Sequence, residues 1–158
     1  MIYYERKGIV LRTATGEDVE EMKGKLRASD VEEVQAIGHT PEQGLRKSLG
    51  DSIICITLEY CKRPIAMCGI APDTIVGERA VIWLLGTDEI KRVPKIFFKM
   101  SLRVIRFFNS LYPYLYNFVY CRNVESMDWL TLCGAEFGDT IPYGDHGEYF
   151  KFFVLRRK

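Results

Sequence analysis

The chain lacks most of the features that would assign it to a membrane, a secretory route or a metal. No run of eighteen apolar residues occurs, and the N-terminus MIYYERKGIV has no apolar signal core, so we expect neither a membrane span nor a leader. The five cysteines are odd in number and never form a Cys-x-x-Cys pair. We therefore expect free thiols in a reducing compartment rather than disulfides or a zinc site.

Histidine is scarce as well. The two histidines, His39 and His146, have no second His at a metal-binding spacing, so we interpret them as loop residues and predict no metal site. Neither is tied by a pattern to a cysteine, and no thiol nucleophile is indicated. Repeats, linkers and low-complexity segments are also missing, and 158 residues with 47% apolar content fit a single domain spanning 1–158.

Acidic residues are missing from one long segment. The net charge is only +1, which selects no partner, but no acid lies between Ile90 and Val124. The basic residues of that segment are Lys91, Arg92, Lys95, Lys99, Arg103, Arg106 and Arg122. Such a cluster can attract nucleic acid, but a solvated helix face is the commoner explanation, so a nucleic-acid partner is not required.

The hydrophobic pattern predicts alternating strands and helices. A capping-box-like Thr15 to Asp18 follows a first strand at 9–13, and Thr40 with Pro41 opens a later helix. The predicted helices are 17–26, 29–38, 40–50, 94–111 and 123–132, and the predicted strands are 9–13, 52–60, 65–71, 79–85, 115–120 and 148–155. Residues 135–137 are expected to pair briefly, and 138–147 to form a polar loop. This order indicates an α/β (α+β) fold: a mixed central sheet of about six or seven strands with helices on both faces.

Two of these elements have the clearest patterns. Residues 80–85 are apolar without alternation, which is typical of a central strand buried on both faces. From Pro94, apolar residues recur every three or four positions while the basic side chains fall on the opposite face, which predicts an amphipathic helix. Gly134 follows the helix at 123–132 and is expected in the left-handed conformation that such ends favour.

The segment NVESMDWLTLCGAEF, from Asn123 to Phe137, resembles a motif of the GCN5-related N-acetyltransferases (GNATs). In that motif an Asn is followed by a small residue three positions on, an apolar pair, and a Gly before an apolar or aromatic residue. Arg12, Ala14 and Asp18 resemble the R-x-A-x-x-x-D pattern of the first strand and helix of the superfamily. The element order is similar along nearly the whole chain, so the resemblance implies a GNAT-like sheet.

Three segments are similar, more narrowly, to acetyltransferase-like proteins of tailed phages, including internal virion proteins of podoviruses. They are LLGTDEIKRVPKIFF, LYPYLYNFVYCRN and WLTLCGAEF. The GNAT resemblance implies that acetyl-CoA enters a V-shaped split between two strands, with its pyrophosphate on backbone amides of the next loop, and that an amine attacks the thioester. The implied partners are acetyl-CoA and an amine acceptor, or other virion proteins, in the bacterial cytoplasm or a phage virion.

The loop after residue 85 departs from the GNAT pattern, in which Gln or Arg, a first Gly, and a second Gly or Ala precede an apolar pair. With 97–98 as that pair, Glu89, Arg92 and Pro94 stand at the three positions. Glu89 repels an anion, Arg92 obstructs close approach of the backbone, and Pro94 has no N–H. We expect impaired pyrophosphate binding, which charge-assisted contacts of three side chains, Lys91, Arg92 and Lys95, compensate only in part.

The resemblance also implies a set of cofactor-binding residues, with Asn123 and Ser126 lining the channel. They are Leu84, Leu85, Gly86, Lys91, Arg92, Lys95, Asn123 and Ser126. The family's thiolate-protonating Tyr is replaced by Leu130, which has no proton to give. The catalytic residues therefore stay unknown.

Two groups of residues near the implied site have a functional and an ordinary interpretation. The nearby carboxylates that could act as a base are Asp88, Glu89 and Glu125, although we favour their interpretation as exposed turn or helix-cap residues. In the family the loop before the last strand often borders the acceptor site, which would involve Tyr143, Asp145 and His146, but we favour the interpretation of this segment as a solvated loop.

Two functions remain open at this point. The first is an acetyl-CoA-dependent N-acetyltransferase with the thioester in the split after Leu85. The second is a phage-type virion protein that keeps the acetyltransferase fold for a structural role and has lost the chemistry. The atypical loop favours the second, and the GNAT-like element order favours the first.

Overall fold

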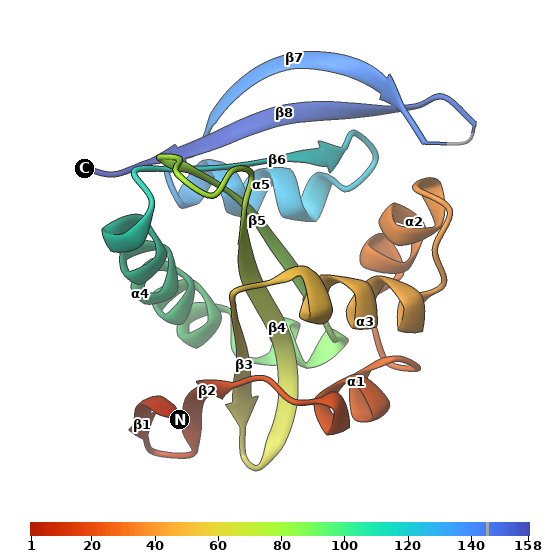
Figure 1. Cartoon of the computed structure of the whole chain (residues 1–158). Helices are drawn as coiled ribbons and strands as arrows, with labels where there is room; N and C mark the ends of the chain where they lie inside the picture. Colours follow the sequence, from red (N-terminus) through yellow and green to blue (C-terminus); the bar gives the residue numbers. More distant parts are fainter. Residues whose placement is uncertain (145) are drawn as a thin grey trace.

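A computed structural model describes residues 1–144 and 146–158 and contains one mixed sheet of eight strands (Figure 1). The strands are β1 (Ile2–Arg6), β2 (Ile9–Thr13), β3 (Ile54–Tyr60), β4 (Arg63–Pro72), β5 (Arg79–Gly86), β6 (Tyr114–Tyr120), β7 (Glu136–Tyr143) and β8 (Glu148–Arg156). They are ordered β1-β2-β3-β4-β5-β6-β8-β7, and every neighbouring pair is antiparallel except β5 and β6. The predicted mixed α/β architecture is confirmed, with more strands than the expected six or seven.

Helices cover both faces of this sheet, as the sequence predicts. They are α1 (Gly16–Met22), α2 (Ala28–Ala36), α3 (Pro41–Asp51), α4 (Pro94–Leu111) and α5 (Val124–Leu132), with a 3₁₀ turn η1 (Asp88–Arg92) before α4. Figure 1 shows α4 on one side of the central strands and α1 to α3 on the other. One hydrophobic cluster joins α4 and α5 to the sheet, and a second joins α1, α2 and α3 to its other face.

Several local predictions are confirmed. Helix α4 begins at Pro94 and buries Phe97, Met100, Val104 and Phe108 on its apolar face. Gly134 has φ +89°, the left-handed conformation expected after α5. Helix α1 is shorter than predicted and ends at Met22.

Both edge strands were missed or truncated in the sequence-based prediction. Strand β1 was not expected, and residues 138–143, predicted as part of a polar loop, extend β7 and pair with β8. Both strands lie at an edge of the sheet, and β7 is mostly exposed, so it shows little of the apolar alternation that identifies a half-buried strand.

The R-x-A-x-x-x-D pattern has a structural basis in this chain. The Asp18 carboxylate accepts two hydrogen bonds from the Arg12 guanidinium, at 2.9 and 2.8 Å, one from the Thr15 N–H at 2.9 Å and one from the Thr57 hydroxyl at 2.8 Å. Although burial acts to raise it, the pKa of Asp18 is lowered overall by these donors and by the Arg12 charge. The pair therefore ties β2 to the start of α1.

No helix in the described residues has the length and apolar character needed to cross a membrane. Within the same residues, no group of three or more His, Cys, Asp or Glu side chains is arranged to hold a metal ion.

Candidate functional site

The two parallel strands separate soon after they meet. Strands β5 and β6 pair only over residues 79–81 and 114–116, and beyond that point they diverge. At the start of the opening, the Asn117 side chain donates from Nδ2 to the Ile82 carbonyl at 2.7 Å, in place of a main-chain contact. The result is a V-shaped split bordered by the later residues of both strands.

A cavity of about 500 Å³ occupies this split and reaches both faces of the sheet. From the α4–α5 side it is lined by Phe97, Met100, Ser101, Val104, Trp129 and Leu130. From the α2–α3 side it is lined by Glu33, Ile37, His39, Ser48, Asp51 and Tyr143. A ligand that passes through the split can therefore meet a second ligand coming from the opposite face.

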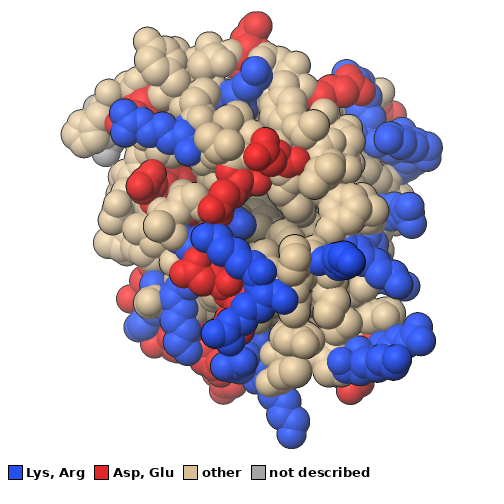
Figure 2. All heavy atoms as spheres, turned by 180° about the vertical axis from the view of Figure 1, so that it is seen from behind, with Lys and Arg blue, Asp and Glu red and all other residues tan. Residues whose placement is uncertain are grey.

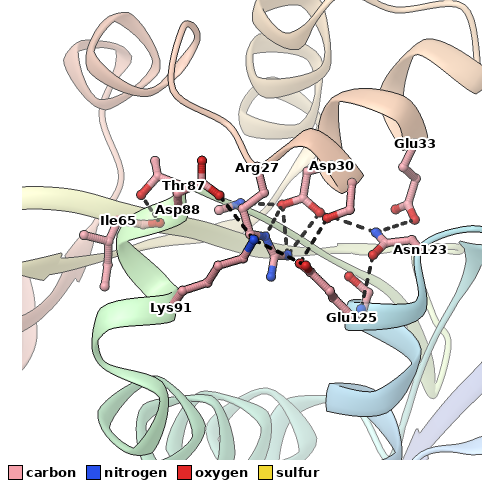
Figure 3. A network of polar contacts seen from close by, with 12 residues as sticks. Arg27, Asp30, Glu33, Ile65, Thr87, Asp88, Lys91, Asn123 and Glu125 are labelled. Atoms are coloured by element: carbon pink, nitrogen blue, oxygen red, sulfur yellow. Dashed lines mark hydrogen bonds and ion pairs between the residues drawn. The ribbon is translucent and has the colours of Figure 1, made fainter.

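Glu33 of α2 is the titratable group best placed for chemistry in this cavity. Its Oε2 accepts a hydrogen bond from the N–H of Tyr120, the last residue of β6, at 3.0 Å. It also accepts one from Asn123 Nδ2 at 3.2 Å (Figure 3). Burial raises the pKa of Glu33 to about 7, and the neighbouring Asp30 adds to this effect, while the Tyr120 N–H opposes it. A carboxyl with that pKa exchanges protons readily at neutral pH.

Next to Glu33, a buried ion pair covers the end of β5. Arg27 contacts the Asp30 carboxylate through Nε at 3.1 Å and Nη2 at 3.0 Å, and both side chains are buried. The Gly86 N–H donates to Asp30 Oδ2 at 2.9 Å, and the Gly86 carbonyl accepts from the Arg27 N–H at 2.9 Å. A Cβ at Gly86 would lie against the end of the Ile90 side chain, which would have to shift to make room for it.

The turn after β5 uses several of its backbone amides internally. The Thr87 N–H donates to the Ile65 carbonyl at 2.9 Å, and the Ile90 and Val93 amides donate to carbonyls within the turn. Pro94 at the start of α4 has no N–H. The basic side chains Lys91, Arg92 and Lys95 are exposed at this end of the helix.

An ion pair links the turn to α5. Lys91 Nζ lies 3.3 Å from Glu125 Oε1 and 3.6 Å from Asp88 Oδ1, so it joins η1 to the first turn of α5 (Figure 3).

Figure 2 shows the side of the molecule turned away in Figure 1, where acidic and basic side chains border a hollow. Asp88 and Glu125 are two of the candidate bases, and the third, Glu89, lies within 4 Å of Arg63 and Arg92. All three carboxylates therefore form exposed or partly exposed ion pairs outside the cavity lining.

The structure separates the cofactor-binding residues implied by the sequence into two groups. Leu84, Leu85 and Ser126 line the cavity, whereas Gly86, Lys91, Arg92, Lys95 and Asn123 lie outside its lining. Asn123 is buried and acts as the N-cap of α5, because its Oδ1 accepts from the Ser126 N–H at 3.1 Å while its Nδ2 contacts Glu33 and Asp30. Its side chain is therefore engaged within the protein.

The remaining sequence candidates have distinct positions. Leu130 is buried and lines the cavity on the α5 side, where it offers only apolar surface. Tyr143, at the end of β7, also lines the cavity, whereas His146 is exposed and lies outside the lining. Asp145 lies outside the described residues.

Sequence reasoning missed Glu33. Glu33 lies in the segment VEEVQ, where it is indistinguishable from its neighbour Glu32 by residue type. Its contact with Tyr120 joins residues 87 positions apart and could not be inferred from local spacing.

No protein-family model matches the sequence, and the search of curated proteins gives no match. Solved structures do match along nearly the whole chain. A probable acetyltransferase has a TM-score of 0.74 at 12% identity, covering 99% of this chain and 97% of its own. A GNAT-family acetyltransferase from Bacillus anthracis has a TM-score of 0.69 at 9% identity, covering 99% and 98% of the two chains.

A third similar structure contains ligands. It is the microcin C7 self-immunity acetyltransferase MccE in complex with acetyl-CoA and AMP, with a TM-score of 0.72 at 9% identity, covering 96% of this chain and 94% of that one. The identities are low, so these matches concern the three-dimensional arrangement. The chain has the GNAT fold.

Proposed function

We propose that this protein is an N-acyltransferase that moves an acetyl group from acetyl-CoA to a primary amine, with Glu33 as the general base. The observation that carries the proposal is the position of Glu33: it lines a cavity that joins both faces of the sheet through the split, and its pKa is about 7. The carboxyl is thus suited to accept a proton from an amine near neutral pH.

The edge of β5 supplies the group that would orient the thioester. The Ile82 and Gly86 carbonyls accept hydrogen bonds from Asn117 and Arg27 and therefore point away from β4. Because the backbone groups of a strand point to the same side at every second residue, the Leu84 N–H also points into the split. That N–H would donate to the thioester carbonyl and stabilise the negative charge that develops there. The cavity and this free edge therefore fit the acyl end of acetyl-CoA.

When bound, acetyl-CoA supplies an acyl carbon that forms a bond to the amine nitrogen while its C–S bond breaks. Glu33 accepts the proton that the nitrogen loses, and its hydrogen bonds from Tyr120 and Asn123 hold the carboxylate in place. Leu130 cannot donate a proton to the departing thiolate, which would take one from water.

The diphosphate end of acetyl-CoA would rely on side chains. Several amides of the turn are already engaged and Pro94 has none, so the main chain contributes less here than in a glycine-rich loop. Lys91, Arg92 and Lys95 would supply charge-assisted contacts instead. We expect acetyl-CoA affinity to be modest and strongly dependent on salt.

A second candidate is a non-catalytic protein that retains the GNAT fold, for which the phage-type similarity suggests a structural role in a virion. Two contacts favour it: Lys91 pairs with Glu125 between η1 and α5, and Asp30 occupies the Gly86 N–H. Both engage groups near the path that acetyl-CoA takes in the proposed enzyme. Recovery of the protein in purified phage particles would support this alternative.

Calorimetric titration with acetyl-CoA separates the two candidates. The enzyme proposal predicts micromolar binding that Arg92→Ala weakens by about fivefold, while Lys99→Ala, an exposed position further along α4, has little effect. Absence of binding at millimolar acetyl-CoA would overturn the enzyme proposal. Acyl transfer to a panel of amines, measured as released thiol, should fall about a hundredfold in Glu33→Gln and stay unchanged in Glu32→Gln.

A further inference from the structure

The α2-facing side of the cavity has an aromatic wall contributed by four strands. Its rings belong to Trp83, Tyr116, Phe118, Tyr143 and Phe150, all of which line the cavity. Phe118 and Tyr143 lie with their ring planes parallel, 3° apart in orientation, at 6.5 Å between centroids. Tyr143 meets Phe150 edge to face at 5.6 Å, so Phe118, Tyr143 and Phe150 form a connected set of rings within the wall.

Few charged side chains line this part of the cavity. Among the described lining residues the acids are Glu33 and Asp51. Asp51 is exposed and paired with Lys47, whose Nζ lies 2.6 Å from its Oδ2, so these two charges offset each other at the rim. Glu33 therefore supplies the unbalanced negative charge next to the rings, because the nearby Asp30 is already paired with Arg27.

We propose that the acceptor is a small arylalkylamine, a primary amine carried on an aromatic ring by a short chain. This inference rests on the proposed function and names the substrate class of that site. The ring of the ligand packs against Phe118 and Tyr143, and its ammonium group approaches Glu33 and the faces of the neighbouring rings. Loss of a proton to Glu33 then gives the neutral amine that attacks.

The same features disfavour the other common amine classes. A linear polyamine carries several positive charges, and a channel that accepted it would need carboxylates at matching intervals, whereas the described lining has one unpaired carboxylate. A cavity of about 500 Å³ is the size of a small-molecule site rather than a peptide groove.

Binding can be measured without acetyl-CoA, which separates this inference from the proposed function. The chain has two tryptophans, so Trp129→Phe leaves Trp83 in the aromatic wall as the fluorescent reporter. We expect 2-phenylethylamine to change the Trp83 emission with a dissociation constant at least about tenfold below those of butylamine and spermidine. Butylamine is the matched control because it keeps the charge and lacks the ring.

Variants test whether the wall produces this preference. Phe118→Leu should weaken 2-phenylethylamine about tenfold and change butylamine less than about twofold, while Phe137→Leu, a half-buried ring outside the cavity, should change neither. Thermal unfolding of each variant verifies that it is folded. Spermidine binding as tightly as 2-phenylethylamine, or an unchanged preference in Phe118→Leu, would overturn the inference.

Acyl-transfer assays on the same amines show whether the acceptor class or the acyltransferase proposal itself is wrong. Transfer that occurs without preference for aryl amines overturns the acceptor class and leaves the acyltransferase proposal standing. Selective binding of 2-phenylethylamine without transfer to any amine overturns the acyltransferase proposal, and with it the role of this amine as an acceptor.

Discussion

The raised pKa of Glu33 makes a prediction about folding stability that does not depend on any substrate. Burial shifts the pKa of this carboxyl from its ordinary 4.5 to about 7. The folded protein then binds the Glu33 proton more tightly than the unfolded chain does, so protonation favours folding. The free energy of unfolding should fall as pH rises from about 4.5 to about 7 and stay lower above that range.

The size of this effect follows from the two pKa values. A change from 4.5 to about 7 corresponds to a loss of about 3 kcal/mol at most when Glu33 ionises in the folded state. Glu33→Gln removes the ionisation and keeps an oxygen that can accept from the Tyr120 N–H and Asn123. The variant should therefore be more stable than the natural protein at pH 8, by up to about 3 kcal/mol, and close to it at pH 4.5.

Urea unfolding at pH 4.5, 6 and 8 measures this difference directly. The other titrating groups are common to both proteins, so the pH dependence of the difference isolates Glu33 and its coupling to Asp30. Glu32→Gln serves as the control, because Glu32 is exposed and adjacent. A stability difference that does not change with pH, or a loss of stability in Glu33→Gln at pH 8, would refute the raised pKa and remove the basis for Glu33 as a base.

Three further predictions follow from other contacts. Asp18→Ala should lower the free energy of unfolding by about 3 kcal/mol or more in urea titrations, since it leaves the Arg12 guanidinium without its closest partner. Gly134→Ala should cost about 1 kcal/mol in the same assay because residue 134 has φ +89°, and no change would contradict this. Glu125→Gln should strengthen acetyl-CoA binding about threefold by releasing Lys91, and weaker binding in calorimetry would count against a role for Lys91.

Local patterns predicted the parts of the fold that are half-buried or centrally placed. The periodicity from Pro94 defined α4 because one face of that helix packs on the sheet and the other meets water. The continuous apolar run of β5 identified a central strand because helices cover both faces of the sheet at this strand. By contrast, β1 and β7 lie at the edges of the sheet, where little burial constrains the residue pattern.

The sequence likewise pointed to only part of the candidate site. The sequence pointed to the motif around Asn123 and to the strand end at Leu84 through their resemblance to the GNAT pattern, and Leu84 lines the cavity whereas Asn123 does not. The same motif did not reveal that Asn123 is engaged as a helix cap and as a donor to Glu33. Those contacts depend on how α2 packs against the end of β6.

The sequence by itself determined the order of the central elements, the periodic face of α4 and the unusual composition of the turn after β5, because each depends on neighbours within a few residues. Only the tertiary structure decided that β5 and β6 part after three paired residues, that rings from four strands form one wall, and that Glu33 rather than its neighbour has a raised pKa. These properties arise from contacts between distant segments, where burial and the pairing of charges are set by the packing of the whole chain.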